Sequence, residues 1–487
     1  MNDKENQESI AKHGAAQTRH RVVLIRLANP NINLVTPPIG IGYILKALTG
    51  ISDIEPVFLD CKLKKIDNDS LIDQLISLKP LIVGFQLFSA DYPQFKKLLP
   101  SIKQKLPQCK IVAGGPHVSG LPSYTLRTNP DLDYVIAGEA EEAFHLLVKS
   151  IQKGYYNTGL EQIPNLVYRQ DTSIIENPKK WIDVHKFGPP AWKYLKPEEY
   201  PAIQHGTFHK SNRVVPILTS RGCPYGCTFC SGHLVTGKKI RLRHVSSVID
   251  EIEWLINTYG FKEFIVEDEN FTFYKSHVIE FADELQRRNI HCWFSFPNGI
   301  RLDKLDEEIV SRLASMGTYM VCVGIESGSK ETMKKMGKNW DQEFVRNRIL
   351  LLKQYGIIVN ASFIMGYRDE TPDDIRQTID FSLSLPIDTA YFGNYLPLPG
   401  SEDFEILIQS GELSLDSIQW QNYNSYAGVF PYHPRKITEQ QLKKAIKKAT
   451  LRFYLRPRIA FNILRRMTHF VFFKSFLSRL YGILLRS

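Results

Sequence analysis

The sequence predicts an α/β protein that contains two sheets of mainly parallel strands. Five short runs rich in β-branched and aromatic residues lie between residues 21 and 153, and each precedes a longer amphipathic segment: Val22–Leu27, Pro56–Leu59, Leu81–Leu87, Lys110–Ala113 and Tyr134–Ala137. Six similar runs lie between residues 213 and 400: Val214–Leu218, Phe264–Val266, Cys292–Phe296, Met320–Val323, Val359–Ile364 and Ala390–Phe392. Strands that alternate with helices at this interval form βαβ units, which assemble into parallel sheets.

The length of 487 residues exceeds what one hydrophobic core usually serves, so two or three domains are expected. Residues 1–20 are polar, mixed in charge and without an apolar signal segment, which predicts a disordered lead-in. Residues 21–153 are expected to form a doubly wound, Rossmann-like parallel sheet. Residues 154–212, rich in Pro, Tyr and Trp, are expected to form an ordered linker with a hairpin at Leu166–Tyr168 and Ser173–Ile175. The second set of strands fills residues 213–400, and residues 401–487 form a mainly helical region.

Three cysteines stand close together in the sequence Cys223-Pro-Tyr-Gly-Cys227-Thr-Phe-Cys230. Three thiolates on one short loop can bind three irons of a [4Fe–4S] cluster and leave the fourth iron open to a small molecule. The alternative is a structural zinc site with His233 as the fourth ligand. Zinc sites usually take their ligands from two separated pairs, whereas here all candidates lie on one loop. The sequence therefore favours iron.

The other four cysteines stand singly in apolar runs: Cys61, Cys109, Cys292 and Cys322. Such cysteines usually behave as buried apolar residues. Free thiols and an oxygen-sensitive cluster both suit a reducing cytoplasm. The composition, 43% apolar and 23% charged, is ordinary for a soluble globular protein.

The cysteine spacing, with the aromatic Phe229 before the last cysteine, resembles the cluster motif of the radical S-adenosylmethionine (SAM) enzymes. The resemblance implies that residues 213–400 form a partial (β/α)6 barrel, with the cluster and SAM at the carboxyl ends of its strands. It also implies a set of SAM-binding residues: Phe229, Asp268, Glu269, Asn298, Arg301, Glu326 and Ile364.

The resemblance gives several of these residues a role. Asp268 and Glu269 are expected to accept hydrogen bonds from the methionyl ammonium group, since a carboxylate and an ammonium form a charge-assisted pair. Glu326, in Gly324-Ile-Glu-Ser-Gly328, is expected to contact the ribose and methionyl part. Ile364 and Glu370 belong to the expected adenine-side strand, which departs from the usual G-x-I-x-G because Ser362 replaces the first glycine. Asn298 and Arg301 are expected at the barrel mouth, where Arg301 could pair with a ligand carboxylate or with a surface acid.

The first sheet is similar to the cobalamin-binding domain that precedes the radical domain in one branch of this family. Ligands of doubly wound sheets lie beyond the carboxyl ends of the strands. The residues expected to bind cobalamin are therefore in the loops there: Pro38, Gly40, Ser89, Gly114, Gly115, His117, Gly138 and Glu139. The Gly114-Gly115 pair indicates either close approach of a ligand or a tight turn.

Many other cobalamin proteins bind cobalt through the histidine of a D-x-H-x-x-G motif. The corresponding stretch here begins Asp60-Cys61-Lys62, and a protonated lysine cannot ligate cobalt. We therefore predict that cobalamin binds without a protein histidine below the metal. His117 lies in a different loop and is expected as a loop or core histidine.

Twelve basic residues and no acidic one follow Glu439, which exceeds the net charge of +10 of the whole chain. The apolar runs among them are too often interrupted to span a bilayer, which requires about 20 mostly apolar residues. A basic, aromatic tail suits the face of an anionic membrane. The alternatives are packing of the tail on the barrel and, less favoured, attraction of nucleic acid.

These features predict a cobalamin-dependent radical SAM enzyme in the cytoplasm, peripheral to a membrane if the tail binds one. In the family, an external donor of the flavodoxin or ferredoxin type reduces the cluster, SAM is cleaved, and a 5′-deoxyadenosyl radical takes hydrogen from an inert carbon. The first prediction is methylation of an unactivated carbon or phosphorus centre of a small or lipid-like substrate. The alternatives are oxidative ring closure on a porphyrin-like substrate, tRNA methylthiolation, for which Cys61 and Cys109 are too few, and a light or redox sensor.

Overall fold

The computed structural model describes residues 19–29, 35–201, 209–423 and 430–466. Its first half contains β1 (His20–Arg26), α2 (Ile39–Leu48), β2 (Ile54–Asp60), α3 (Cys61–Lys64), α4 (Asn68–Leu78), β3 (Ile82–Gln86), η1 (Ser89–Asp91), α5 (Tyr92–Lys105), β4 (Lys110–Gly114), α6 (Pro116–Gly120), α7 (Pro122–Arg127), β5 (Tyr134–Ile136), α8 (Glu141–Gln152), η2 (Leu160–Gln162), β6 (Leu166–Gln170), β7 (Ser173–Glu176), α9 (Trp192–Leu195) and η3 (Pro197–Glu199).

The second half contains β8 (Val214–Ile217), β9 (Ser220–Arg221), α10 (His233–Thr236), β10 (Arg241–Leu242), α11 (Val245–Tyr259), β11 (Glu263–Val266), α12 (Lys275–Arg287), β12 (Trp293–Phe296), η4 (Leu302–Lys304), α13 (Glu307–Ser315), β13 (Thr318–Glu326), α14 (Lys330–Lys335), α15 (Gln342–Gln354), β14 (Ile358–Met365), α16 (Pro372–Ser384), β15 (Thr389–Asn394), α17 (Glu402–Gln409), η5 (Trp420–Asn422), α18 (Glu439–Tyr454) and α19 (Pro457–Arg466). All eleven predicted strands are present.

The first sheet has the strand order β2-β1-β3-β4-β5-β6-β7, and β1 to β5 are parallel. Residues Val22 to Ile25 of β1 are at most 4% exposed, so this strand is covered on both faces, as parallel sheets require. The predicted hairpin forms as β6 and β7, and it pairs antiparallel with β5. The hairpin is therefore part of the first sheet, whereas the sequence predicts that it lies in a linker. The difference arises because the pattern of strand residues does not show which strand a hairpin pairs with.

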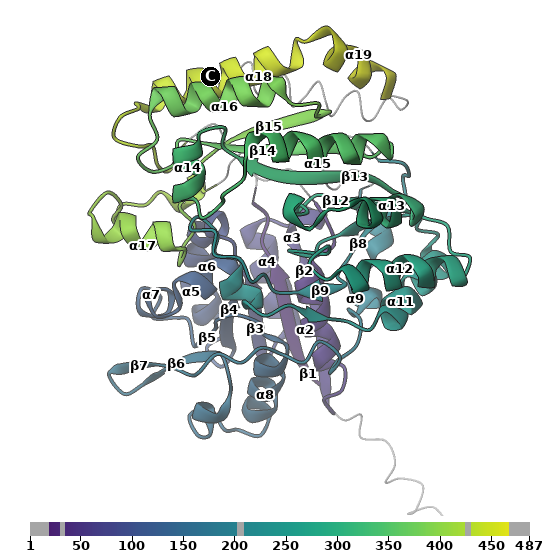
Figure 1. The fold of residues 1–487 in the computed structure, drawn as a ribbon. Coiled ribbons are helices and arrows are strands. Elements are labelled where there is room, and N and C mark those ends of the chain that lie inside the picture. The colour runs from purple at the N-terminus through teal and green to yellow at the C-terminus, as the bar shows by residue number, and fades with distance from the viewer. Residues whose placement is uncertain (1–18, 30–34, 202–208, 424–429, 467–487) are drawn as a thin grey trace, which may run out of the picture.

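The second sheet has the order β15-β14-β13-β12-β11-β8, and all neighbouring strands are parallel. This confirms the predicted fold class. Figure 1 shows the first sheet in the lower half of the molecule and the second above it, with α15, α16 and α18 over the far side of the second sheet.

The two halves meet through loops at the carboxyl ends of both sets of strands. Gly120, at the end of α6, lies against the segment after β15 so closely that a Cβ atom there would be 2.3 Å from the Pro399 carbonyl oxygen. Only glycine permits this approach of two backbones. The ends of the strands at which ligands bind in such folds therefore face a common region.

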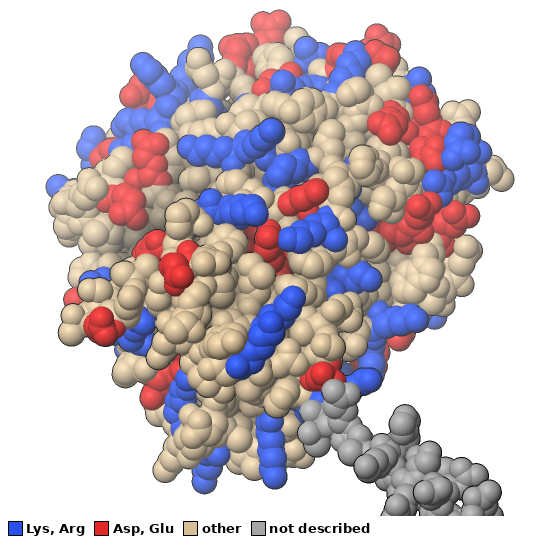
Figure 2. Space-filling view, turned by 90° about the horizontal axis from the view of Figure 1, so that it is seen from below, with Lys and Arg blue, Asp and Glu red and all other residues tan. Residues whose placement is uncertain are grey.

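Basic residues are concentrated near the end of the sequence. On the face of the molecule that is seen from below, in contrast, they are spread out. Figure 2 shows Lys and Arg side chains scattered there among neutral and acidic residues, without one large basic patch on that face. No helix among the described residues has the length and apolar character that a bilayer crossing requires.

Candidate active site

The loop with the three cysteines follows β9 and is closed at its base by β10, which pairs with β9. Gly222, at the start of the loop, has φ 103°, and a Cβ atom there would lie 2.3 Å from the Lys239 carbonyl oxygen. This position requires glycine, because other L residues avoid the conformation and the obstructing atom is backbone. The cysteines are therefore held in one tight loop directly after β9.

The three thiols are partly buried and influence one another. Burial is the largest cause that raises the pKa of Cys227 and Cys230, and the neighbouring Cys223 raises both further. The Gly232 N–H donates to Cys230 Sγ at 3.4 Å, and Asn270 Nδ2 donates to Cys223 Sγ at 3.6 Å. Outer donors of this kind support metal-bound thiolates.

The three thiols fit a cluster better than a single metal ion. Among the described residues, no group of three His, Cys, Asp or Glu side chains is placed to hold one metal ion. In a [4Fe–4S] cluster each thiolate binds a different iron. Three partly exposed thiols on one loop, with N–H donors behind two of them, fit such a cluster.

Asp268 and Glu269 lie directly after β11 and hold the stem of the cysteine loop. The Asp268 carboxylate is 2% exposed and accepts from the Thr219 N–H at 2.7 Å and from the Ser220 hydroxyl at 2.6 Å. Burial raises its pKa to about 6, although these hydrogen bonds lower it. Glu269 accepts from the Gly222 N–H at 3.2 Å. Asp268 therefore supports the loop, because neighbouring donors occupy its oxygens, and contact of Asp268 or Glu269 with SAM stays a prediction.

Glu326 lies at an irregularity where the register between β13 and β14 shifts. Its φ of 67° is uncommon for a residue other than glycine, and such strain is typical of functional positions. Its carboxylate pairs with Lys338 Nζ at 2.6 Å, and both side chains are less than a tenth exposed. A Cβ atom on Gly324 would lie 2.3 Å from Glu326 Oε1, so a larger residue at position 324 would displace this carboxylate. Sequence reasoning missed Lys338, which stands in no recognisable motif.

Phe229 and Ile364 are brought together although 134 other residues separate them in the sequence. Both lie at the edge of a small apolar cluster whose buried members are Met336, Tyr367, Tyr395, Leu407 and Tyr432. The Lys338 ammonium lies 5.8 Å from the centre of the Phe229 ring. The predicted adenine-side strand therefore lies next to the cysteine loop, with a buried ion pair nearby.

Asn298 and Arg301 lie after β12 and contact neighbouring protein groups. Asn298 Nδ2 donates to the Glu267 carboxylate at 2.6 Å. Arg301 pairs with Asp303 at 2.8 Å, the surface-acid alternative, and its guanidinium lies 3.5 Å from the centre of the Tyr225 ring. Because Tyr225 belongs to the cysteine loop, Arg301 packs against that loop. Contact of either residue with SAM stays a prediction.

Most residues predicted to bind cobalamin lie at the carboxyl edge of the first sheet: Pro38 and Gly40 at the start of α2, Ser89 in η1, Gly114 at the end of β4, Gly115 directly after it and His117 in α6. Gly115 has φ 104°, and a Cβ atom there would lie 2.8 Å from the Leu87 carbonyl oxygen. This glycine therefore makes a tight turn against the end of β3. The sheet order reverses between β1 and β3, and this is where doubly wound sheets bind ligands.

His117 is a buried histidine, as expected. Its Nδ1 atom hydrogen-bonds with the Ser89 hydroxyl at 3.1 Å, and its ring packs between Tyr92 and Trp420. Burial lowers its pKa to about 3, which keeps the ring neutral. Nε2 has no hydrogen-bond partner among the described residues. An unpartnered buried nitrogen at this edge fits a polar ligand there, since buried polar atoms are normally paired.

Lys62 stands where many cobalamin proteins have their cobalt-binding histidine. Burial is the main cause that lowers its pKa to about 8, and the nearby Arg26 lowers it further. Asp60 caps α3 by accepting from the Lys62 N–H at 3.1 Å, and it also accepts from the Tyr200 hydroxyl at 2.6 Å. Binding of cobalamin without a histidine below the metal stays a prediction.

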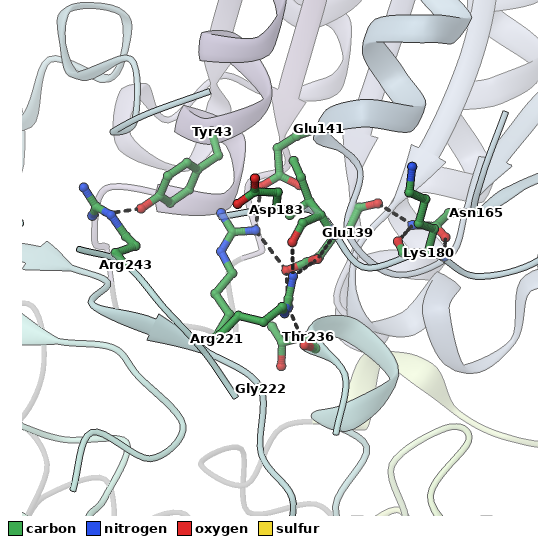
Figure 3. Close-up of polar contacts among 12 residues, drawn as sticks. Tyr43, Glu139, Glu141, Asn165, Lys180, Asp183, Arg221, Gly222, Thr236 and Arg243 are labelled. Carbon is green, nitrogen blue, oxygen red and sulfur yellow. Dashed lines mark hydrogen bonds and ion pairs between the residues drawn. The ribbon is translucent and has the colours of Figure 1, made fainter. Parts of the chain in front are cut away.

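Gly138 and Glu139, which are also predicted to bind cobalamin, lie where the two halves of the chain meet. Figure 3 shows Glu139 between the two halves, where its carboxylate accepts from Arg221 at 3.0 Å and from Arg241 at 2.7 Å. Gly138 has φ 106°, and its N–H donates to the Ser119 hydroxyl. The Glu139 side chain is thus used in ion pairs with the stem of the cysteine loop, and contact of the Gly138–Glu139 segment with cobalamin stays a prediction. Sequence reasoning missed both arginines because their partners are about a hundred residues distant.

Glu370 gives the site a testable pH dependence. Its carboxyl group is buried, and burial raises its pKa from 4.5 to about 8, against the lowering effect of the Gly366 and Tyr367 N–H groups that donate to it. The folded chain therefore keeps a proton that the unfolded chain has lost between pH 4.5 and about 8. Over this range the free energy of unfolding falls as pH rises, by about 1.4 kcal/mol per unit.

Glu370→Gln is expected to remove this slope, because a neutral amide can replace the protonated acid. Urea unfolding between pH 5 and 8 measures it in the parent and the variant. Glu343→Gln, at an exposed position of α15, serves as the control and should keep the parental slope. Equal slopes in the parent and the Glu370→Gln protein would mean that the folded chain holds Glu370 ionised.

Comparisons with known proteins agree with this site. A model of the radical SAM superfamily matches residues 217–382, and a model of the B12 binding domain matches residues 25–148. The chain is thus a radical SAM protein with a B12 binding domain in front. It belongs to the cobalamin-binding branch of the radical SAM family, and the three predicted cofactors, a [4Fe–4S] cluster, SAM and cobalamin, are those of this branch.

Three curated proteins illustrate its relatives. The chain is 28% identical to an uncharacterized methyltransferase of Pyrococcus horikoshii, over 87% of this chain and 89% of that protein. It is 26% identical to the cytidylyl-2-hydroxyethylphosphonate methyltransferase of Streptomyces wedmorensis, over 82% and 84% of the two chains. It is also 26% identical to the anaerobic magnesium-protoporphyrin IX monomethyl ester cyclase of Rubrivivax gelatinosus, over 76% of this chain and 66% of the cyclase.

Two solved structures share the fold. The radical SAM methyltransferase TsrM from Kitasatospora setae, solved with cobalamin and a [4Fe–4S] cluster, matches with a TM-score of 0.70 at 17% identity, over 88% of this chain and 91% of TsrM. The cobalamin-dependent radical SAM enzyme OxsB matches with a TM-score of 0.73 at 16% identity, over 96% of this chain and 72% of OxsB. Both likenesses support the order of the two domains.

The first part of the basic tail packs on the barrel. α18 contacts β15 and α16, and it buries Leu442, Ala449 and Phe453. Arg456 donates to the Leu383 carbonyl oxygen at 2.7 Å and stacks on Phe453. The packing alternative therefore holds for residues 439–456. Most of the apolar runs of the tail lie in residues 467–487, outside the described residues.

Proposed function

We propose that this chain is a cobalamin-dependent radical SAM methyltransferase that acts on an unactivated carbon or phosphorus centre of a small molecule. The observation that carries the proposal is that the cysteine loop and the switch point of the first sheet both lie at carboxyl strand ends which face a common region. A methyl group passes between SAM and cobalamin only if the two sites adjoin. Two of the relatives, named as methyltransferases, support the same activity.

The residues of this chain have separate tasks in such a reaction. When bound, the cluster and SAM supply a 5′-deoxyadenosyl radical and cobalamin supplies methyl-transfer chemistry. Cys223, Cys227 and Cys230 would hold the cluster. Phe229 and Ile364 would provide the apolar wall that excludes water from the radical. The paired Glu326 and Lys338 would keep the polar side of the SAM site fixed, because a buried ion pair has little freedom to move.

A second candidate is an oxidative cyclase, which the similarity to the Rubrivivax gelatinosus enzyme favours. The methylthiolation alternative has less support. Cys61 and Cys109 are buried in the core of the first sheet, and burial raises the pKa of each thiol to about 12. Buried neutral thiols are poor cluster ligands, because the thiolate is the form that binds metal.

Anaerobic reconstitution, with iron, sulfide and corrinoid counted per chain, is the first test. The reduced protein is then supplied with SAM alone. A methyltransferase is expected to release both 5′-deoxyadenosine and S-adenosylhomocysteine, since the second compound marks loss of the methyl group. Formation of 5′-deoxyadenosine without S-adenosylhomocysteine would favour the cyclase. Once a substrate is known, a product heavier by one methylene unit supports methyl transfer, whereas loss of hydrogens or gain of oxygen contradicts it.

We also propose that an external electron donor of the flavodoxin or ferredoxin type reduces the cluster.

We propose in addition that the basic tail contacts an anionic membrane. Leu455 and Phe461 are 74% and 63% exposed and lie among basic residues of α18 and α19. Such a surface suits a lipid headgroup layer and would suit a lipid-like substrate. The protein is expected to float with anionic liposomes but not with neutral ones, and Leu455→Ser/Phe461→Ser should weaken flotation. Recovery of the full-length protein in the soluble fraction would contradict membrane contact.

A further inference from the structure

Two arginines stand opposite each other at the base of the cysteine loop. Arg221 in β9 and Arg241 in β10 are direct partners in the antiparallel ladder. Side chains of direct partners project from the same face, and like charges in this arrangement repel. Arg221 is also separated from the first cluster cysteine by Gly222 alone. The fold must therefore neutralise two adjacent positive charges beside the cluster.

The first domain supplies the two opposite charges. Arg221 Nη1 lies 2.7 Å from Glu141 Oε1 and 3.0 Å from Glu139 Oε1. Arg241 donates to both oxygens of Glu139, at 2.7 and 2.8 Å. The side chains of the two acids are at most 6% exposed and those of the two arginines at most 15%. Two positive and two negative charges are thus paired largely out of solvent, and Figure 3 shows Arg221 beside Glu139 and Glu141.

The contacts around these four residues continue into both domains. The Arg221 guanidinium lies 4.3 Å from the centre of the Tyr43 ring in α2. Arg241 also donates to the Thr236 carbonyl oxygen at 2.7 Å, and the Thr236 hydroxyl donates to Glu269 at 2.6 Å. The cysteine loop is therefore attached to the barrel through Glu269 and to the B12 binding domain through Arg221 and Arg241.

We propose that Glu139, Glu141, Arg221 and Arg241 form a joint that sets the position of the B12 binding domain relative to the cysteine loop, and with it the separation of cobalamin from the cluster. These are positioning residues, since their charged groups are used by one another. The role of the joint in methyl transfer rests on the proposed function. The fixed distance between the two cofactor sites can be tested independently of that function.

The first test measures that distance. The reduced cluster and cob(II)alamin each carry an unpaired electron, so pulsed EPR of the reconstituted protein reports the distribution of distances between them. The parent is expected to give one narrow distribution. Glu139→Gln/Glu141→Gln keeps the shape of both side chains but removes their charge, and it should broaden or shift the distribution. Hydrogen exchange of residues 221–241 in the cofactor-free protein should become faster in the same variant.

The second test separates two reactions of SAM. Release of 5′-deoxyadenosine requires only parts held by the barrel, whereas release of S-adenosylhomocysteine requires cobalamin to lie within reach. A displacement of about 1 Å can reduce a rate roughly 100-fold. The double variant is therefore expected to lose most S-adenosylhomocysteine formation while it retains 5′-deoxyadenosine formation. If the parent forms no S-adenosylhomocysteine, the proposed function fails, and the EPR and exchange results still decide the joint.

Arg288→Gln is the matched control. Arg288 pairs with Glu284 at 2.6 Å and also with Asp250 and Glu253, on the outer helices of the barrel, so its loss removes ion pairs without touching the joint. This variant should keep the parental distance distribution, exchange rates and product ratio. A narrow, unshifted distribution and unchanged exchange in Glu139→Gln/Glu141→Gln would overturn the proposal. If the double variant does not fold, Glu141→Gln, which removes only one of the two acceptors of Arg221, provides the same measurements.

Discussion

Replacement of Cys227 by alanine is expected to reduce cleavage of SAM below the detection limit. Two thiolates remain on the loop after this change. A [4Fe–4S] cluster needs three protein thiolates if a single iron is to stay free for SAM, so a cluster with two ligands is not held correctly. The fold should survive, because Cys227 lies partly exposed in a loop and substitutions at such positions usually change stability by less than about 1 kcal/mol. Iron and sulfide content, the EPR signal of the reduced protein and 5′-deoxyadenosine release measure the effect.

Cys292→Ala provides the control for this experiment. Cys292 is also a free cysteine, 9% exposed, but it lies just before β12, at the opposite end of the strand from the barrel mouth. Its replacement should cost about 1 kcal/mol of stability and leave the cluster content at the parental level. SAM cleavage by Cys227→Ala at the parental rate would rule out the assignment of the loop as the cluster site.

The strands of this protein could be predicted because each is a short run of β-forming residues followed by an amphipathic segment that predicts a helix by itself. β13 and β14 illustrate the limit of that reasoning, because the expected runs ended at Val323 and Ile364 whereas the strands extend to Glu326 and Met365. The extension places Glu326 within the strand at an irregular position. Local composition cannot show this, because neither the φ of 67° at Glu326 nor its ion pair with Lys338 follows from the residues beside it in the sequence.

The candidate site was predictable where a motif carries the chemistry and not where partners come from distant parts of the chain. The cysteines and the pair of Phe229 with Ile364 belong to the first kind. Asp268 belongs to the second, because its two hydroxyl donors, Thr219 and Ser220, lie between β8 and β9, and no local pattern shows that they donate to it. Glu139 is similar, since 82 positions separate it from Arg221. The role of a carboxylate near the predicted barrel mouth can therefore be assigned only when its hydrogen-bond and ion-pair partners are known.

Lys338→Met is expected to destabilise the protein by about 3–5 kcal/mol, because it leaves the Glu326 carboxylate buried without its partner. The same change should weaken SAM binding. Glu326 is predicted to contact SAM, and the Lys338 ammonium, 2.6 Å from Glu326 Oε1, holds the carboxylate in place. Urea unfolding and equilibrium binding of SAM to the reconstituted protein measure the two effects. Lys353→Met is the matched control: Lys353 pairs with Asp388 at 2.6 Å, where the Val359 N–H also donates to that carboxylate near the start of β14. It should lower stability and leave SAM affinity unchanged.

The double variant Lys338→Met/Glu326→Gln separates the structural role of the pair from its role in binding. With no buried charge left, most of the lost stability should return, because replacing both members of a buried pair by neutral groups is often nearly neutral. SAM affinity should stay low, since the carboxylate that would contact the ligand is absent. If affinity returns together with stability, the pair only supports the fold at the end of β13, and the contact with SAM must come from another residue at the mouth.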